Sequence, residues 1–377
     1  MTLKTDEGWS VGFDGFVNGF AGYERGSETP ANMVADPLLT KDGANSFRMR
    51  TGLLPGLFGF TVAAPTTEGL DVKARVGFYP QIQNNNTRNA FGAQIDLREV
   101  FFTVDSKYGQ VLLGRALNLY QGRNILTDMT LFGLGAPGPV GSGGTTLGRI
   151  GYGYLYANFG AQLRYTTPAF SGVKLAVAVV DPSQISGGGV AATQTNSPGF
   201  EAEVSWSTKM EGGTKLEAWA SGLYQRASIP GGARKLAEGA AGGLSAGFGP
   251  VELLVSGFGG KGLGSFLLLD TDALDSAGEE RSGFGVLAQA SYMILASTKV
   301  GVSYGQNTMN ETAAELAARQ AGAPSTLSTR RSFTGGIYHD FNKNLKAVLE
   351  FTHAVGEWYS GPSQSVDVVG VGGFFLW

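Results

Sequence analysis

The chain has 377 residues with a formal net charge of -3; 59 residues are glycine, 16% are charged and none is cysteine. The lack of cysteine excludes disulfides and cysteine-ligated metals, and two histidines, His339 and His353, are too few for a histidine-rich metal centre. The near-neutral charge balance lacks the clustered basic face of a nucleic-acid-binding protein. We therefore expect no cofactor, no metal site and no nucleic-acid partner.

Apolar and polar residues alternate with a period of two along most of the chain, and the helical period is nearly absent. In Leu70–Phe78 the even positions are apolar and the odd ones are mostly charged. The one predicted helix is Asn310–Ala321, with Asn310 as its cap. The alternation predicts strands at Trp9–Tyr23, Phe47–Ala63, Leu70–Phe78, Ala93–Val104, Val111–Ala116, Phe159–Thr166, Val173–Val180, Phe200–Trp206, Leu216–Tyr224, Gly239–Phe248, Val251–Phe258, Phe284–Tyr292, Val300–Tyr304, Phe333–Phe341, Leu345–Phe351 and Val366–Trp377.

The connections between these strands alternate between short turns and long loops. Short turns are predicted at Pro65–Gly69, Asp105–Gly109, Pro168–Gly172 and Asn342–Asn344, whereas the other connections run over roughly 10 to 35 residues. If each connection joins antiparallel neighbours, all short turns lie at one end of the sheet and all long loops at the other. Bacterial outer-membrane barrels have this arrangement, with short periplasmic turns and long extracellular loops.

A closed barrel of about sixteen strands is too wide for its own side chains to fill. Water inside and hydrocarbon outside removes this difficulty, since Leu345, Ala347, Leu349 and Phe351 then face lipid and Lys346 faces water. No apolar run approaches the length of about 18 residues that a membrane-spanning helix needs. The sequence therefore predicts an all-β, transmembrane antiparallel β-barrel that forms one domain over residues 1–377.

One long segment, about residues 117–148, shows neither strand nor convincing helix periodicity. It is too apolar for a disordered segment, and an apolar loop must bury itself against other parts of the protein. We predict that it folds into the barrel and narrows it. Its apolar residues are Leu117, Leu119, Ile125, Leu126, Met129, Leu131 and Phe132.

Four segments resemble the Gram-negative outer-membrane porins, a family of trimeric diffusion channels. The first two are RTGLLPGLFGFTVAAPTTEGLDVKARVGF and LREVFFTVDSKYGQVLLGRALNLY, which is followed by the expected constriction loop. The other two are AQLRYTTPAFSGVKLAVAV and the C-terminal VVGVGGFFLW, which ends in Trp377 where the family usually has phenylalanine. The resemblance implies a bacterial outer-membrane location, contact with lipid, a homotrimer, and passive diffusion of ions and small hydrophilic solutes.

Basic residues occupy the predicted inward face of the early strands, and they are our candidates for the pore constriction: Arg48, Arg50, Lys73, Arg75, Arg98 and Arg115. Charges that line a pore set its ion selectivity. Alternatively, some of them only pair with Asp71 and Asp96 on the same wall. With Arg98 inward, strict alternation turns Glu99 outward. Later strands turn Glu201, Glu203, Glu217, Glu252 and Glu350 inward, either as an acidic wall or as solvated charges without a specific role.

The constriction loop adds Arg123 and Asp128 to these candidates. Family members often carry several carboxylates on this loop, whereas residues 117–148 contain only Asp128. The pair either contributes to the constriction or holds the loop to the wall, with Arg75 or Arg98 as partners. A basic wall facing a loop with few carboxylates favours anions.

Three functions are compatible with this pattern. The first is a general pore for passive diffusion, and the second is a substrate-specific channel with a saturable binding track. The third is an outer-membrane barrel enzyme or adhesin that acts through its external loops. Neither histidine has the neighbourhood of a Ser-His-Asn site of the kind that an outer-membrane phospholipase needs, so we predict a channel and no enzyme.

Overall fold

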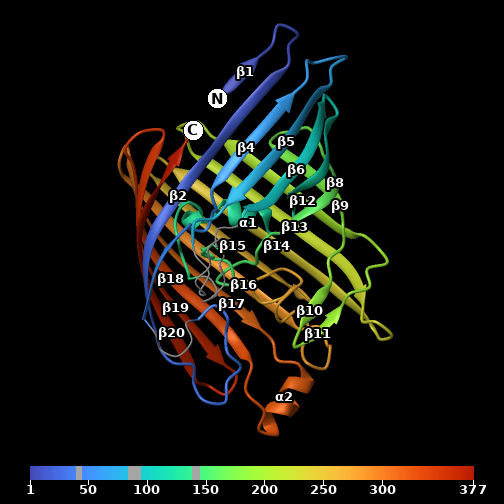
Figure 1. Cartoon of the computed structure of the whole chain (residues 1–377), viewed down its shortest axis with the longest axis vertical. Coiled ribbons are helices and arrows are strands. Elements are labelled where there is room, and N and C mark those ends of the chain that lie inside the picture. Colours follow the sequence, from blue (N-terminus) through green and yellow to red (C-terminus); the bar gives the residue numbers. More distant parts are fainter. Residues whose placement is uncertain (40–44, 84–94, 138–144) are drawn as a thin grey trace.

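The computed structural model describes residues 1–39, 45–83, 95–137 and 145–377. Within them, one antiparallel sheet curls into a barrel that closes where β2 (Ser10–Gly26) pairs with β20 (Ser363–Leu376). Both termini lie at the short-turn end of the barrel, and the long loops gather at the other end (Figure 1). The part of the predicted inner loop at 138–144 lies outside the described residues.

The described sheet contains 18 strands, which form a barrel wall of 16. The difference arises because β1 (Thr2–Lys4) pairs only with the start of β2, and because β3 (Asn45–Arg50) and β4 (Leu57–Ala63) both pair with β2 as two parts of one wall strand. The other wall strands are β5 (Asp71–Pro80), β6 (Ile95–Ser106), β7 (Gly109–Leu117), β8 (Phe159–Thr166), β9 (Val173–Val180), β12 (Gly199–Lys209), β13 (Lys215–Ser228), β14 (Arg234–Phe248), β15 (Val251–Lys261), β16 (Ser282–Leu295), β17 (Thr298–Met309), β18 (Leu327–Asp340) and β19 (Leu345–Trp358).

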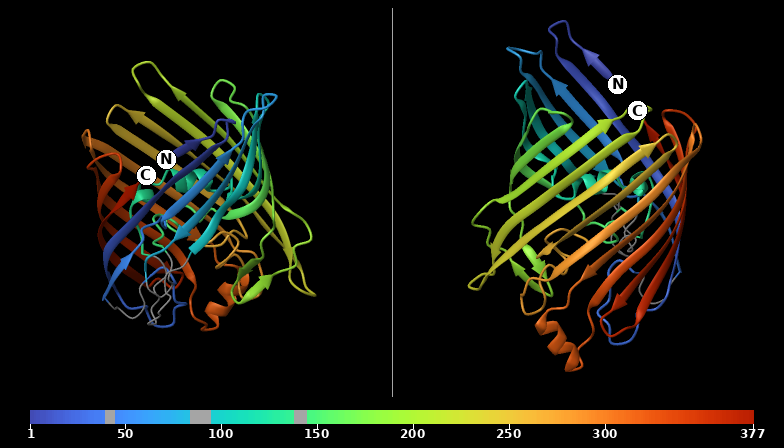
Figure 2. Two further views of the ribbon diagram at one scale, coloured as in Figure 1. Left: turned by 45° about the horizontal axis from the view of Figure 1, so that its top comes forward. Right: turned by 180° about the vertical axis from the view of Figure 1, so that it is seen from behind.

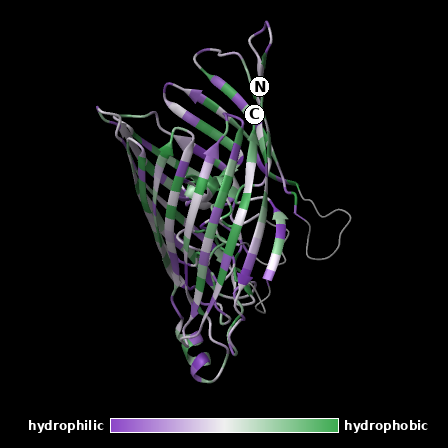
Figure 3. Ribbon diagram, turned by 90° about the vertical axis from the view of Figure 1, so that its left-hand side faces the viewer, coloured by the Kyte–Doolittle hydropathy of each residue, from purple (hydrophilic) through white to green (hydrophobic). Residues whose placement is uncertain are grey.

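Alternate residues of each strand face opposite sides of this wall, as predicted. Along β20, Val369 and Val371 are about half exposed on the outer surface, whereas Val366, Val368 and Phe374 are buried on the inner side. Hydrophobic and hydrophilic residues alternate along the strands in Figure 3. A band of exposed large apolar side chains on the outer surface is what a hydrocarbon environment requires.

A β-bulge in β6 corrects one prediction about side-chain direction. Gly77 of β5 pairs with Glu99 and the next residue, Phe78, pairs with Leu97, so Arg98 has no partner in the register. The extra residue turns both Arg98 and Glu99 away from lipid, and Glu99 accepts a hydrogen bond from the Arg75 guanidinium. Glu99 therefore does not point outward, because the bulge interrupts the strict alternation.

The predicted strand Phe47–Ala63 is interrupted between β3 and β4, because residues 51–56 leave the wall and fold toward the lumen. Thr51 and Leu53 are buried, and the backbone amide of Leu53 donates to the carbonyl of Gly133 in the inner loop. Asn18 of β2 compensates for the lost ladder bonds by accepting from the amide of Gly52 and donating to the carbonyl of Leu54.

All four predicted short turns are present at one end of the barrel. In the turn before β9, Gly172 has φ +83°, and a Cβ there would lie 2.3 Å from the carbonyl oxygen of Ser207, so only glycine fits. At the other end, two connections are much shorter than predicted, since β13 and β14 are joined by residues 229–233 and β19 and β20 by residues 359–362. The strands there extend beyond their apolar alternation into polar residues, which the pattern alone did not reveal.

The remaining elements belong to the loops. The strands β10 (Ile185–Gly187) and β11 (Val190–Ala192) form a separate hairpin, and α2 (Ala313–Gln320) is the predicted helix. Its N-cap is Thr312 rather than Asn310, because Thr312 and Glu315 form a reciprocal capping box. Neither of the two short α-helices among the described residues is long and apolar enough to cross a membrane.

The outward orientation can be tested by placing one charge on each side of the wall. Val369→Arg puts a cation near the middle of β20 on the outer surface. We expect it to lower the free energy of unfolding from lipid vesicles by about 2–4 kcal/mol, because the charge then faces hydrocarbon. Urea titration of the refolded protein measures this loss. Ser207→Arg, on the inward face of β12, serves as the control and leaves the folding free energy nearly unchanged. An equal loss in both variants would contradict the assignment of the two sides.

Candidate functional site

A loop inside the barrel is the main feature of the lumen. Residues 118–158 connect β7 to β8, extending ten residues further than predicted, and they contain α1 (Gly122–Leu126) and the 3-10 turn η1 (Met129–Phe132). The loop lies within the ring of strands in both views of Figure 2. Its Tyr120, Tyr152 and Tyr154 are fully buried although they belong to no strand. The predicted inward fold of this segment is therefore present.

Two wall carboxylates hold this loop by its backbone, one at its start and one near its middle. Glu201 of β12 accepts hydrogen bonds from the amides of Leu119 and Tyr120, at 2.8 and 2.9 Å. Glu350 of β19 accepts from the amides of Leu134 and Gly135, both at 2.7 Å. Both carboxylates are almost fully buried. Charge-assisted bonds of this kind satisfy loop amides that have no partner in a sheet or helix.

Asp128 organises the interior of the loop. Its carboxylate accepts from the amide and hydroxyl of Thr130 at 2.8 Å, the amide of Arg149 at 3.1 Å and the hydroxyl of Tyr154 at 2.6 Å. Burial raises the pKa of the Asp128 carboxyl, and the bonds from Tyr154 and Thr130 oppose that rise. Four donors around one carboxyl favour its ionised form.

Arg149 connects the far side of the loop to the wall, and the sequence analysis did not identify it. Its guanidinium donates to the hydroxyl of Thr334 at 2.8 Å and to the carbonyl of Ser332 at 2.6 Å, both on β18. The side chain is fully buried. Its position after residues 138–144, in a segment with no periodicity, gave no signal of a wall contact.

Part of the lumen is packed by side chains of the loops, so the interior is narrowed by more than the inner loop alone. Leu38 and Leu39 from the first long loop, Phe266 from the loop between β15 and β16, and Trp358 join a hydrophobic core inside the barrel. A buried ion pair, Asp36 with Arg330 at 2.6 Å, fixes the first loop to β18. Long apolar loops bury their side chains against one another, and this packing restricts the water-filled path.

The predicted basic wall is present, but most of its arginines have partners. Arg75 donates from both terminal nitrogens to Asp14, at 2.9 and 3.0 Å, and from Nε to Glu99 at 2.8 Å. Arg98 donates from Nε to Asp96 at 2.8 Å. Its guanidinium also lies 5.5 Å from the ring centre of Tyr79 and 5.6 Å from that of Phe159.

The other predicted wall residues differ in environment. Arg50 is buried and lies 3.8 Å from Glu24, and Arg48 lies on the same face of β3, half-buried. Lys73 is exposed on β5. Arg115 is exposed near the C-terminal end of β7, and no hydrogen bond or ion pair joins it to another described residue.

The two predicted loop residues do not contact each other. Arg123 of α1 donates to Glu203 of β12 at 2.8 Å and keeps about a third of its side chain exposed, whereas Asp128 is buried within the loop. Two cations missed by the sequence analysis also face the lumen, namely Arg164 of β8, which donates to the carbonyl of Leu117, and Lys174 of β9. Their positions in the alternation of those strands could have identified both.

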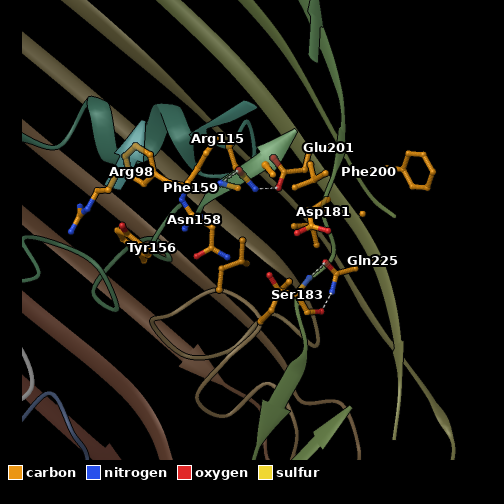
Figure 4. A pocket seen from close by; sticks show the side chains of 18 of the residues that line it. Arg98, Arg115, Tyr156, Asn158, Phe159, Asp181, Ser183, Phe200, Glu201 and Gln225 are labelled. Atoms are coloured by element: carbon orange, nitrogen blue, oxygen red, sulfur yellow. Dashed lines mark hydrogen bonds between the residues drawn. The ribbon is translucent and has the colours of Figure 1, made fainter. Parts of the chain in front are cut away.

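A cavity of about 360 Å³ opens where β7, β8 and β9 end. Arg98 and Arg115 line it together with Tyr156 and Asn158 of the inner loop. Figure 4 shows Arg115 and Asn158 on one side of this cavity and Ser183, hydrogen-bonded to Gln225, on the other. Asp96, Asp181 and Glu201 also line the cavity, so it contains charges of both signs. The terminal nitrogens of Arg98 and Arg115 have no hydrogen-bond partner among the described residues.

A closed barrel with an apolar outer band and a lumen narrowed by an anchored loop defines a membrane-embedded channel. Residues 5–356 match the family described as Gram-negative porin, and the chain belongs to that family. A search of curated proteins found no match. The chain is therefore a passive channel of the bacterial outer membrane, and its family and fold point to a channel rather than an enzyme.

Solved structures share this fold at low sequence identity. The channel DcaP of Acinetobacter baumannii is 17% identical with a TM-score of 0.73, covering 100% of this chain and 99% of that one. An anion-selective porin from Comamonas acidovorans is 16% identical with a TM-score of 0.65, covering 97% and 100%. A trimer form of OmpT of Vibrio cholerae is 13% identical with a TM-score of 0.55, covering 98% and 99%.

The anchoring by wall carboxylates can be tested at Glu350. Glu350→Ala leaves the amides of Leu134 and Gly135 and the hydroxyl of Tyr338 without their acceptor. We expect local stability to fall by about 3 kcal/mol, which corresponds to roughly hundredfold faster hydrogen exchange in residues 130–137. Asp105→Ala is the control, because among the described residues this wall carboxylate accepts hydrogen bonds only from Gln110 and Thr103. Unchanged exchange in the Glu350 variant would contradict this role.

Proposed function

We propose that this channel favours anions over cations and works as a homotrimer. The observation that carries the first part is the way in which the lumen uses its carboxylates. Glu201, Glu350 and Asp128 are buried and accept hydrogen bonds from the inner loop, so they are not available to attract mobile cations. The charges that remain accessible then decide the selectivity.

Among the described wall residues without an ion-pair partner, cations outnumber carboxylates. The cations on the inward faces are Lys73, Arg164, Lys174, Lys209 and Lys215, and the carboxylates are Asp71, Asp105 and Glu217. The cavity at the ends of β7 to β9 adds one of each, Arg115 and Asp181. Asp105 is further occupied by a hydrogen bond from Gln110 at 2.7 Å. An excess of accessible positive charge in a confined space lowers the cost of holding an anion there.

Arg98 and Arg115 are the proposed entry site for anions. Stacking against Tyr79 and Phe159 fixes the Arg98 guanidinium, and its bond to Asp96 uses only Nε. Arg115 lines the same cavity and is exposed. Arg75, in contrast, is held by two carboxylates, so it contributes as part of a cluster with net negative charge. The anion-selective porin of similar fold makes this preference a reasonable expectation.

A substrate-specific channel is the second candidate, since the same cavity offers both arginines and aromatic rings. The two candidates differ in their response to solute concentration. A general pore conducts in proportion to concentration, whereas a binding track saturates and is blocked by one class of solute. An enzymatic or adhesive role of the external loops stays the third hypothesis, without a specific observation in its favour.

Reversal potentials across a planar bilayer in a potassium chloride gradient test the anion preference. We expect chloride to be the more permeant ion, and the double variant Arg98→Ser with Arg115→Ser to lower the chloride-to-potassium permeability ratio roughly twofold or more. The control is Arg331→Ser, because Arg331 pairs with Glu357 on the outer surface of the barrel. A cation preference in the native channel would overturn the proposal.

The proposed trimer follows from the uneven height of the wall. The strands β8 and β9 have 8 residues each, whereas β18, β19 and β20 have 14 each. A strand needs about 9 to 11 residues to span a membrane. The strands β8 and β9, which form the low side of the barrel, are therefore too short to cross the whole hydrocarbon layer. Next to this low side, Ile95 of β6 has an exposed fraction of 69%, and Phe47 of β3, which pairs with β2, has one of 64%. Other copies of the chain would cover the wall from β3 to β9, and the solved trimer form of OmpT, which has a similar fold, supports this proposal.

Light scattering in detergent should give three copies of the 39.4 kDa chain per particle. The double variant Phe47→Ser with Ile95→Ser removes apolar contact area from the wall between β3 and β6, and we expect its trimer to dissociate at a lower temperature. Phe333→Ser with Ile337→Ser removes a similar area from β18 on the other side, where lipid replaces the contact. Equal thermal stability of the two trimers would contradict the placement of the interface.

A further inference from the structure

A second cavity lies in the lumen on the wall away from the two arginines. It measures about 390 Å³. It lies between the first half of the inner loop and the wall strands β13 to β17, on the side of the loop that faces the short turns. Sites for small molecules typically begin at about 300 Å³. Neither the proposed anion path at Arg98 and Arg115 nor the anchoring carboxylates Glu201 and Glu350 use this space.

The roof of this second cavity is apolar. Leu126, the last residue of α1, has an exposed fraction of 58%, and Met129, Leu131 and Phe132 of η1 line the cavity beside it. The loop is fixed here, since Gln289 of β16 donates to the carbonyl of Thr127 at 2.6 Å and accepts from the amide of Met129 at 3.1 Å. A rigid apolar patch that faces water is a contact surface for an apolar group of a ligand.

The floor of the second cavity is charged, with both signs present. Lys299 of β17 lies 3.7 Å from Glu252 of β15, and Ser291 donates to the same carboxylate at 3.1 Å. Lys215 and Glu217 lie on the same inward face of β13, two residues apart. Residues in this relation are separated by about 6.7 Å along a strand. No ion pair joins either of them to another described residue, so both charges are available to a ligand.

Small residues on β14 keep the cavity open. Ser245, Ala246 and Gly247 line it, and a Cβ at Gly247 would meet only the Cβ of Lys215, at 3.8 Å. A larger side chain at Gly247 would therefore occupy the cavity without a clash in the wall.

We propose that this second cavity binds an amphipathic zwitterion, namely an α-amino acid with a large apolar side chain. Its ammonium group pairs with Glu217 and its carboxylate with Lys215, while its side chain rests on Leu126 and the residues of η1. A molecule of one charge satisfies only one of the two wall charges, and a small zwitterion leaves the apolar roof exposed. The bound molecule lies beneath the loop and partly obstructs the pore from the short-turn end, which in this family faces the periplasm.

The test is block of single-channel current by L-phenylalanine added to the periplasmic side. We expect saturable, reversible block. Glycine lacks the apolar group, 3-phenylpropionate lacks the ammonium and phenethylamine lacks the carboxylate, so we expect each of them to block at least tenfold more weakly. Block by glycine as strong as that by phenylalanine would overturn the proposal, and so would block by phenylalanine that does not saturate.

Matched variants locate the site. Lys215→Gln with Glu217→Gln should weaken block by phenylalanine at least tenfold, and Gly247→Leu should abolish it by filling the cavity. Lys209→Gln is the control, because Lys209 pairs in register with Lys215 but does not line the cavity. The unblocked conductance of each variant reports whether it has folded. Block that persists in both cavity variants while their conductance is normal would overturn the assignment.

This inference and the proposed anion preference can fail separately. The reversal potential is measured without amino acid, and its proposed determinants Arg98 and Arg115 lie at the other cavity. The variant Lys215→Gln with Glu217→Gln removes one charge of each sign, so it leaves the excess of accessible cations unchanged. Phenylalanine carries no net charge at neutral pH, so its block does not depend on which inorganic ion the channel prefers.

Discussion

Every buried backbone amide of the inner loop must find an acceptor, and this constraint shapes the channel. In the wall, the closed ladder of strands satisfies the backbone groups. Residues 118–137 and 145–158 leave that ladder and enter the lumen, so they need other partners. Glu201 supplies an acceptor at the start of the loop, Glu350 supplies one near its middle, and Asp128 supplies one between them. A neutral amide side chain would offer one acceptor oxygen, whereas each carboxylate offers two and accepts several donors at once.

The same bonds affect ion conduction. A carboxylate that is buried and surrounded by donors contributes little to the field in the water-filled path, and it cannot exchange a counter-ion with solvent. The lumen therefore contains more carboxylates than are accessible to ions in the water-filled path. Exposed residues such as Lys73 and Lys174 are, under the proposed anion preference, the charges that a passing ion meets. Structural and functional charges in this barrel are separated by burial.

The loops divide the lumen unevenly. The first loop and the loop between β15 and β16 pack against the inner loop with Leu38, Leu39 and Phe266, and they close part of the external side. What is left is a cavity near Arg98 on the low wall and a second cavity beneath Leu126 on the high wall. Their chemistry differs, with arginines and aromatic rings at one cavity and charges of both signs beside apolar loop residues at the other. We therefore propose different ligands for the two cavities.

The amino-acid pattern determined the barrel, its strand number and the side that faces lipid, because a period of two over so many segments has one consistent solution once water and hydrocarbon are assigned. It also identified the apolar loop that enters the lumen. The contacts inside the lumen were decided by the tertiary structure. The bulge at Arg98 and Glu99 breaks the local alternation and turns both side chains inward. Arg123 and Asp128 have different partners, and Arg149 binds β18, so these contacts join residues that are distant in sequence. A period reports the direction of a side chain relative to its own strand, whereas a partner across the lumen depends on how the whole sheet curves and where the loop comes to rest.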